Sequence, residues 1–460
     1  MNRNYDFGSV NLDVSVGRER AAKPAADDPF RIAIFGDFSG SGITKRKPVL
    51  IDRDNFEDVF RYFGVSLDLP VAGRIGFAEL DDFHPDWLYE RVSLFEPLRR
   101  ALAEPGTPKR SAPTANAAPP PMAALSFDSL LEDAMEATES RHEEKTVRDP
   151  LRAWISEKAA PYTTAPVPAA ESERHELVSG VIAAQMRALL HYPDFQQLEA
   201  LWRAIHFLVR RTDTDHGLSI RLIDISRDEL IQNLDGVREL LRAHGPWSLF
   251  VGAYSFGPGE KDLQALAAFG ATAAQFNASF LSAAEPRLVG CESIGALSDP
   301  TEWLPVEAAW DQFRSSGAAA HVGLALPRFL LRQPYGAKTD PCERITFEEM
   351  GTEHDHDRLL WGNPAILCAC LLADSFEEEG WRMRPGKHSN VGGLPVYVYH
   401  EDREAVAQPC AESVMTERAA QEMLNRGVMC IASLKDTDEV RLVRFQTVTK
   451  PPTPLAGLWQ

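Results

Sequence analysis

A proline-rich stretch divides this chain into two parts that must fold on either side of it. Residues 105–122 read PGTPKRSAPTANAAPPPM, with six prolines and mostly Ala, Ser and Thr between them. Such a segment offers few side chains to bury and few amide protons for helix or sheet hydrogen bonds. We therefore expect an extended Pro/Ala-rich linker, with a small folded part before it and a larger one after it.

Length and composition indicate a soluble protein of several domains. A chain of 460 residues exceeds the span of one ordinary core, which favours two or three domains. No run approaches the roughly 18 to 20 apolar residues of a membrane span, so we expect no direct membrane insertion. The N-terminus lacks the continuous apolar core of a signal peptide. We therefore predict a cytoplasmic protein.

Charge and cysteine usage exclude several classes of function. The net charge of −19 argues against binding to nucleic acid or anionic lipid, both of which require a basic surface. The six cysteines include Cys368 and Cys370 inside the apolar run AILCACLLA, and no C-x-x-C pair exists. Zinc and thioredoxin-type chemistry therefore have little support, and we expect reduced thiols.

The part before the linker has the pattern of a small α/β domain. Residues 1–29 are polar and predict an N-terminal arm. Within 30–104, short apolar runs predict strands at 31–35 and 74–80. Helical spacing of apolar residues predicts helices at 56–64 and 81–104. The linker region, 105–170, contains amphipathic helices at 126–161.

Residues 171–460 alternate helices and strands, as a large α/β domain does. The expected helices are 171–193, 194–212, around 227–244 and around 262–280. The expected strands are 218–225, 247–254, 321–327, 394–400, 427–434 and 439–450. The predicted fold class is therefore α/β (α+β), with a small α/β N-terminal domain and a large mixed-sheet α/β domain.

The last predicted strand, EVRLVRFQTVTK (439–450), has two mixed faces. One face carries three apolar residues: Val440, Leu442 and Val448. The other carries Val443, Phe445, Thr447 and Thr449. Neither face is purely apolar, which is typical of an edge strand or of a strand exchanged between subunits.

Two local patterns suggest chemistry but fit it poorly. GTEHDHDRLLWGN (351–363) contains His354, His356 and Asp357, yet its ligand-type residues are contiguous and cannot all converge on one ion. GDFSGSGITK (36–45) follows a strand, but its glycine spacing is one residue short of a phosphate-binding loop. We therefore predict no cofactor, no metal site and no catalytic site.

Several stretches resemble the contractile sheath of the bacterial type VI secretion system. Four stretches resemble the small sheath subunit: DPFRIAIFGDFSG (28–40), PVLIDRDNFEDVF (48–60), RIGFAEL (74–80) and DDFHPDWLYERV (81–92). Four further stretches resemble the large subunit: LLHYPDFQQLEALWRAIHFLVRRTD (189–213), VGAYSFGPGEKDLQAL (251–266), HVGLALPRFLLRQPYG (321–336) and LLWGNPAILCACLLADSF (359–376). The chain thus looks like both sheath subunits fused, with 105–170 as the junction.

The resemblance implies a non-enzymatic structural protein. In that family the two subunits form a heterodimer that polymerises helically around an inner tube and contracts to propel it. An AAA+ ATPase then disassembles the contracted sheath. The implied partners are therefore further copies of this chain, the inner tube protein, a baseplate and the recycling ATPase.

The resemblance also implies contact residues. Sheath subunits exchange strands with their neighbours, so the N-terminal arm and the last predicted strand are our candidates for assembly. The candidate residues are Val10, Leu12, Val14, Val440, Leu442, Val443, Phe445 and Val448. The ATPase docks on an N-terminal helix of the large subunit, which corresponds here to the helix carrying Phe127, Leu130 and Leu131.

Two alternatives remain at this point. The small-subunit part stops near residue 104, without the long helical C-terminal region of that subunit. This difference favours a sheath-derived baseplate or adaptor component that does not contract. The other alternative is a metal-dependent hydrolase that uses His354, His356 and Asp357.

Overall fold

The computed structural model describes residues 24–25, 27–40, 47–70, 72–103, 169–214, 217–351, 355–401 and 404–459. The predicted N-terminal arm up to residue 23 and the predicted linker helices at 126–161 lie outside these ranges.

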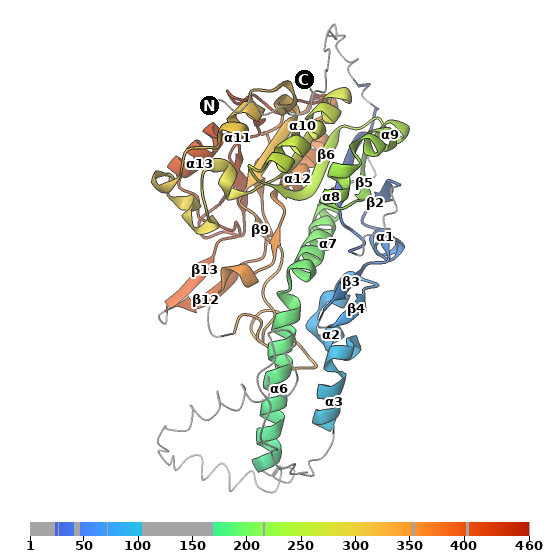
Figure 1. The fold of residues 1–460 in the computed structure, drawn as a ribbon, viewed down its shortest axis with the longest axis vertical. Coiled ribbons are helices and arrows are strands. Elements are labelled where there is room, and N and C mark those ends of the chain that lie inside the picture. Colours follow the sequence, from blue (N-terminus) through green and yellow to red (C-terminus); the bar gives the residue numbers. More distant parts are fainter. Residues whose placement is uncertain are drawn as a thin grey trace, which may run out of the picture.

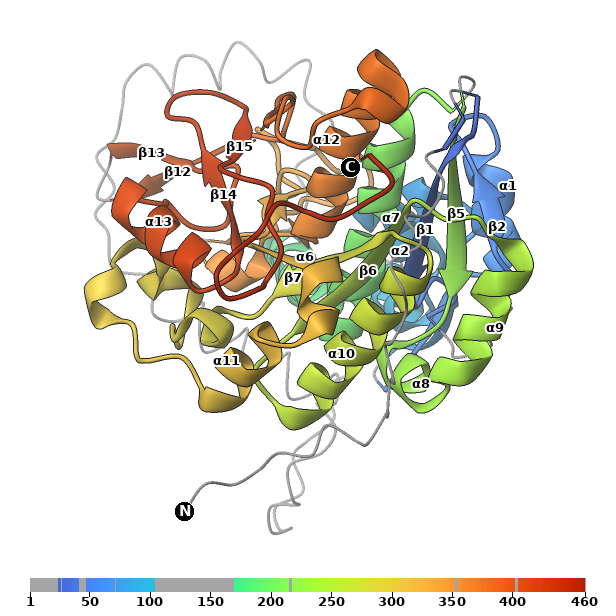
Figure 2. The same ribbon diagram turned by 90° about the horizontal axis from the view of Figure 1, so that it is seen from above.

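A mixed nine-stranded sheet forms the centre of the molecule (Figures 1 and 2). From one edge to the other, its strands are β11 (Asn390–Val391), β15 (Val440–Leu442), β14 (Met429–Ser433), β8 (Val322–Leu326), β7 (Ser279–Ala284), β6 (Leu249–Phe256), β1 (Phe30–Gly36), β5 (Leu218–Asp224) and β2 (Val49–Ile51). The strands from β14 to β5 run parallel, whereas β15 and β2 are antiparallel to their neighbours. The predicted α/β class with a mixed sheet is confirmed.

Helices cover both faces of the sheet, as a parallel sheet requires. Alternate residues of β1 divide between two cores: Ile32 and Ile34 face one, and Ala33 and Phe35 face the other. The first core contains α1 (Phe56–Phe63), α2 (Pro85–Arg91), α3 (Glu96–Ala103), α6 (Ala169–Leu190), α7 (Pro193–Arg211) and α12 (Pro364–Glu379). The second contains α8 (Arg227–Gln232), α9 (Leu234–His244), α10 (Glu260–Gln275), α11 (Ala308–Arg314) and α13 (Glu417–Asn425).

The remaining regular elements are short. Three two-stranded sheets pair β3 (Ser66–Leu69) with β4 (Gly73–Gly76), β9 (Phe329–Leu330) with β10 (Trp361–Gly362), and β12 (Tyr397–Glu401) with β13 (Glu404–Gln408). The 3₁₀ helices are η1 (Leu80–Phe83), η2 (Ser93–Phe95), η3 (Pro286–Val289), η4 (Ile294–Ser298), η5 (Pro300–Glu302), η6 (Gly317–His321), η7 (His356–Arg358) and η8 (Gly380–Arg382). Within the described ranges, no helix has the length and apolarity needed to cross a bilayer.

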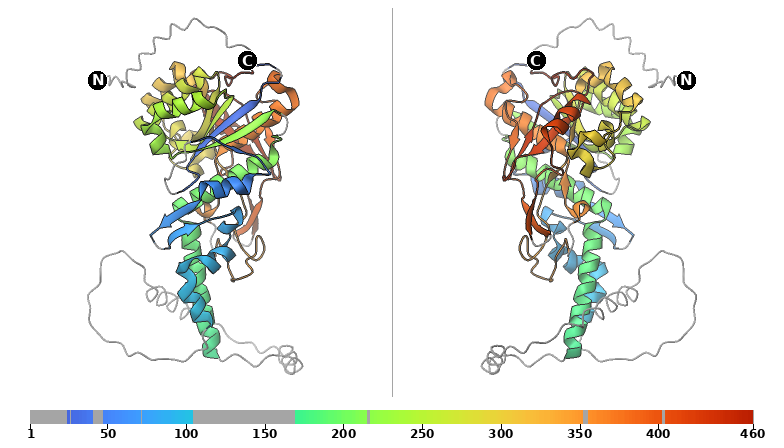
Figure 3. Two further views of the ribbon diagram at one scale, coloured as in Figure 1. Left: turned by 90° about the vertical axis from the view of Figure 1, so that its right-hand side faces the viewer. Right: turned by 90° about the vertical axis from the view of Figure 1, so that its left-hand side faces the viewer.

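The segment before the linker shares the sheet and the core of the segment after it. Strand β1 pairs with β5 on one side and β6 on the other. The ring of Trp202 on α7 packs 4.5 Å from that of Phe60 and 5.5 Å from that of Phe38, centroid to centroid. Helices α3 and α6 run side by side away from the sheet as a stalk (Figures 1 and 3). The two segments therefore form one packed body.

The predicted helix at 81–104 is wrong as a single element, because a proline interrupts it. Pro85 has no amide proton and disfavours helical backbone at the residue before it. His84 is accordingly extended, and its Nδ1 accepts a hydrogen bond from the amide of Asp86 at 3.2 Å. Helix α2 begins there, and α3 follows after a second break at Val92. The strand predicted at 74–80 likewise ends at Gly76.

Two predicted helices of the large segment also differ from the structure. The helix around 227–244 divides into α8 and α9 at Asn233. The helix around 262–280 ends at Gln275, and the next residues form strand β7, which was missed. Its sequence SFLSAA combines serines and alanines, which have little preference for strands. The hydroxyl of Ser282 lies 2.8 Å from the carbonyl oxygens of both Gly252 and Tyr254 and shares its one proton between them, so its burial costs little.

The last predicted strand is much shorter than 439–450. Strand β15 ends at Leu442, and the chain then crosses the amino ends of the parallel strands. The amide of Val448 donates to the carbonyl oxygen of Val322 at 2.9 Å, at the start of β8. The hydroxyl of Ser279, at the start of β7, donates to the carbonyl oxygen of Ala456 at 2.5 Å. The C-terminal segment is thus part of the fold rather than a tail.

Candidate functional site

A buried ionic cluster joins α7 to the loop that follows β9. Arg332, in that loop, donates from Nε to Oε1 of Glu199 at 2.8 Å. Its Nη1 donates to Oε2 of Glu349 at 2.7 Å. The Glu199 and Glu349 side chains are 0% and 1% exposed. One guanidinium therefore bridges two buried carboxylates.

Further residues complete this ionic cluster. Arg203, one turn after Glu199 on α7, donates from Nε to Glu199 Oε1 at 2.7 Å and from Nη2 to the Tyr335 hydroxyl at 3.0 Å. Nε2 of His191 lies 3.4 Å from Oε1 of Glu349. Five of these six residues, all except Glu349, come from the two stretches 189–213 and 321–336 that the sequence singled out separately. The fold brings those stretches together.

Electrostatics keep both carboxyl groups of the ionic cluster charged. Burial alone raises the pKa of Glu199, but Arg332 and Arg203 outweigh it and hold that pKa below its usual range. Burial likewise opposes ionisation of Glu349, yet Arg332 and His191 lower its pKa to about 2. Both carboxyls therefore stay charged at neutral pH and have no proton to donate.

Sequence reasoning missed this ionic cluster, although two signals pointed to it. Glu199 lies inside the apolar run of α7 beside Leu198 and Trp202, which are buried. Arg332 interrupts the apolar run FLLRQ. Charged residues among core residues are almost never fully buried unless they are paired. Glu199 and Arg332 lie 133 positions apart, and no local pattern reveals a pairing over that separation.

The candidate assembly residues divide into buried, exposed and undescribed groups. Four are buried by other parts of this chain: Val440, Leu442, Phe445 and Val448. Val443 is 42% exposed. The candidates Val10, Leu12 and Val14, and the docking candidates Phe127, Leu130 and Leu131, lie outside the described residues. Among the described candidates, only Val443 has an exposed side chain.

The hairpin β12–β13 is the most exposed pair of strands in the described part of the chain. It projects from the body below the sheet (Figure 1). Val398 is 50% exposed, and Ala405 and Ala407 are exposed on the partner strand. At its base, Tyr397 packs on a small core around Trp361, and its partner Gln408 is buried. An isolated hairpin is marginally stable in water, so this one depends on that attachment.

The candidate metal ligands that the structure describes, His356 and Asp357, belong to no metal-binding group. His354 lies outside the described residues. Nδ1 of His356 lies 3.3 Å from Oδ1 of Asp357, its Nε2 lies 3.6 Å from Oε1 of Glu412, and its ring stacks on Trp361. Among the described residues, no group of three or more His, Cys, Asp and Glu side chains has metal-binding geometry.

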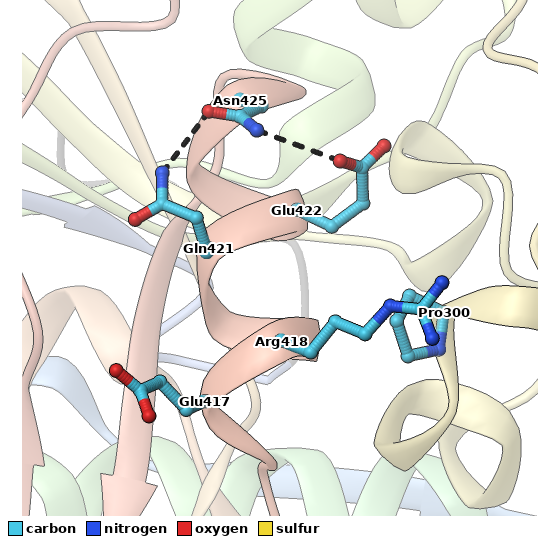
Figure 4. Close-up of a pocket in the computed structure, with 6 residues that line it drawn as sticks. All are labelled: Pro300, Glu417, Arg418, Gln421, Glu422 and Asn425. Atoms are coloured by element: carbon cyan, nitrogen blue, oxygen red, sulfur yellow. Dashed lines mark hydrogen bonds between the residues drawn. The ribbon is translucent and has the colours of Figure 1, made fainter.

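One surface pocket accompanies α13 (Figure 4). It has a volume of about 640 Å³ and is lined by Pro300, Glu417, Arg418, Gln421, Glu422 and Asn425. The side chains of Gln421, Glu422 and Asn425 are hydrogen-bonded to one another along the helix. The pocket thus presents a polar helix face without a converging set of reactive groups.

Comparison with known proteins places these features in a family. The family described as EvpB/VC_A0108, tail sheath N-terminal domain, matches residues 175–449. The type VI secretion system sheath protein TssC1 of Pseudomonas aeruginosa is 34% identical to this chain over 296 residues. That alignment covers 59% of this chain, and the chain spans 59% of the length of that relative.

Proposed function

This chain belongs to the EvpB/VC_A0108 tail sheath family, and we propose that it is a structural subunit of a type VI secretion sheath. In this proposal the subunit polymerises helically around an inner tube and contracts to propel it. The observation that carries the proposal is the family match over 175–449, which includes all four stretches that resemble the large subunit. We propose a cytoplasmic location and no catalytic activity.

We also propose that the chain fuses a small-subunit-like segment to a large-subunit-like segment. The packing supports this proposal, because β1 lies between β5 and β6 and the core around Trp202 contains residues of both segments. The proposed partners are other copies of the chain, the inner tube protein, a baseplate and an AAA+ ATPase.

General physics is consistent with a polymer of this kind. Contacts between different surfaces of identical subunits that do not close into a ring generate a helical filament. Contraction requires two packings close in free energy, with the extended one trapped during assembly. The subunit needs no nucleotide site for that stroke.

One structural observation favours the adaptor alternative. Strand β15 is hydrogen-bonded to β14 on one side and to β11 on the other. Exchanging it with a neighbour would therefore break two existing pairings within the chain. A component that keeps the sheath fold without strand exchange through β15 is the second candidate.

Electron microscopy of the purified chain tests the proposal. The chain is imaged both alone and after co-expression with the tube protein encoded beside it. Long hollow tubes with a regular helical lattice are expected for a sheath subunit. Monomers or small discrete oligomers under both conditions would contradict it and favour the adaptor. Metal analysis of the same preparation addresses the hydrolase alternative, which requires a stoichiometric metal that is lost in His356→Ala.

Point variants test the C-terminal contact better than a deletion, because removing 440–460 also removes buried residues such as Val448 and Leu455. Val443→Asp changes an exposed side chain and should abolish tubes while the chain stays folded, if this surface contacts a neighbour. Val414→Asp is a matched control, since Val414 is 60% exposed elsewhere on the surface. If both variants form tubes equally well, Val443 is not part of the proposed contact.

A further inference from the structure

The turn after β1 is a junction between three parts of the fold. The carbonyl oxygen of Phe38 accepts a hydrogen bond from Trp202 Nε1 of α7 at 3.0 Å. The carbonyl oxygen of Ser39 accepts one from the amide of Ser66 in β3 at 3.0 Å. Gly40 has φ +67°, and a Cβ there would lie 2.7 Å from the Ser66 carbonyl oxygen. The turn therefore adopts a close-packed conformation that links the sheet to α7 and β3.

Asp224, the last residue of β5, holds this turn through one carboxyl oxygen. Its Oδ1 accepts hydrogen bonds from the amides of Phe38 at 2.8 Å and Ser39 at 3.1 Å. The residue is 1% exposed, and its Oδ2 has no hydrogen-bond partner in the described part of the chain. A buried carboxylate with one unsatisfied oxygen is costly, so this contact depends on the charge of the group.

Apart from the Phe38 and Ser39 amides and the Ser39 hydroxyl, the described groups near Asp224 oppose its ionisation. Asp37 belongs to the same turn, and its Oδ1 accepts from the Gly40 amide at 3.1 Å. Burial raises the pKa of Asp37, and the charges of Glu229 on α8 and Asp194 on α7 act in the same sense, while the Gly40 amide opposes them. From β6, the buried Tyr254 hydroxyl donates to the carbonyl oxygen of Ile225 at 2.6 Å. These elements supply negative or neutral groups around the turn.

We propose that Asp224 is a proton-sensitive clamp, which holds the turn after β1 more firmly when its carboxyl group is protonated. In the neutral form Oδ1 still accepts from the two amides, while the buried charge and its repulsion by Asp37 disappear. The clamp couples pH to the strength of the junction between the sheet and the segment that contains β3. This inference concerns the fold and does not depend on the proposed sheath function.

The direction in which pH changes the opening of the turn follows from proton linkage. Burial raises the pKa of Asp224 from 3.8 to about 6, and Asp37 contributes in the same sense. The Ser39 amide, the Ser39 hydroxyl and the Phe38 amide offset part of the effect. When the turn opens, the carboxyl meets water and regains its ordinary pKa. The closed turn thus binds a proton more tightly than the open one. Opening should be about fourfold less favourable at about pH 5.5 than at about pH 7.5.

Hydrogen exchange of the full chain, corrected for the intrinsic effect of pH on exchange, measures this opening. The peptide that contains Phe38 and Ser39 is followed at both pH values. The wild type should show the fourfold change, and Asp224→Asn a clearly smaller one, because asparagine keeps the accepting oxygen but does not titrate and only Asp37 in the turn still responds to pH. Asp228→Asn is the matched control: it neutralises an exposed carboxyl in the first turn of α8 and should behave like the wild type.

Two results would overturn the proposal. One is an opening constant with the same pH dependence in the wild type and in Asp224→Asn. The other is opening that becomes more favourable as the pH falls. If the turn opens only by global unfolding, the equilibrium constant for unfolding must show the same difference between the two proteins, so the test remains decisive.

Discussion

Arg332 is the residue on which two buried carboxylates depend for their charge balance. Arg332→Met keeps most of the side-chain volume but leaves Glu199 with Arg203 alone and Glu349 without its guanidinium. Removing one partner of a buried ion pair typically costs about 3 to 5 kcal/mol. We expect a loss of that size in the free energy of unfolding, measured by urea denaturation monitored by circular dichroism.

Arg344→Met is the control for that variant. Arg344 and Glu90 form an ion pair at 3.0 Å with side chains 58% and 45% exposed. An exposed pair contributes at most about 1 kcal/mol. If both substitutions cost the same, the ionic cluster does not stabilise the fold as described.

The lowered pKa of Glu349 predicts how the free energy of unfolding depends on pH. Its pKa in the folded protein, about 2, lies below the ordinary value of 4.5, so the unfolded chain takes up the proton first. Its contribution is therefore present above about pH 4.5 and is lost as the pH falls towards 2. Glu349→Gln should flatten the fall in unfolding free energy over that range, by an amount on the order of 2 kcal/mol.

Urea unfolding at a series of pH values from neutral to acid makes this measurement. The adjacent Glu348→Gln is the control, because Glu348 is exposed. If Glu349→Gln keeps the full wild-type dependence of the unfolding free energy on pH, the Glu349 carboxyl does not contribute to that dependence.

At the scale of elements, β12 and β15 differ in how much of their apolar surface this chain covers. Val398 in β12 is 50% exposed, whereas Val440 in β15 is 1% exposed. Val398→Asp should change the free energy of unfolding by no more than about 0.5 kcal/mol. Val440→Asp buries an unpaired charge and should cost about 3 kcal/mol or more. Thermal and urea unfolding of the two variants compare the strands directly; similar losses would contradict the burial pattern.

At the scale of the whole molecule, the linker should be dispensable once the chain has folded. A protease site placed within 105–122 allows the chain to be cut after purification. Because β1 lies inside the sheet and α1 packs on α7, the two fragments should still elute together in size-exclusion chromatography. Separation of the fragments without denaturant would show that the shared core is too weak to hold them.

Separate expression of the two fragments completes that experiment. The fragment that begins after the linker lacks β1 and would have a gap between β5 and β6. We expect it to be insoluble alone and soluble when co-expressed with the fragment before the linker. A soluble, cooperatively folding large fragment on its own would contradict the role of β1 as an internal strand.

Local periodicity and the recurring motifs were enough to determine much of this protein. The apolar runs of β1, β5, β6 and β8 and the amphipathic spacing of α7 identify these elements without tertiary information. The quoted stretches at 189–376 were sufficient to indicate the sheath family, whose match to 175–449 is now shown. The predicted arm, linker helices and their contact residues stay predictions.

Only the tertiary structure decided where distant residues meet. Phe30 of β1 pairs with Leu218 of β5, across the whole linker, and Arg332 neutralises Glu199 from another part of the chain. The C-terminal run has a mixed pattern typical of an exchanged strand, yet Val440 and Leu442 are buried by β14 and its neighbours. A sequence pattern reports which side chains avoid water, whereas the partner that covers them is set by packing between segments far apart along the chain.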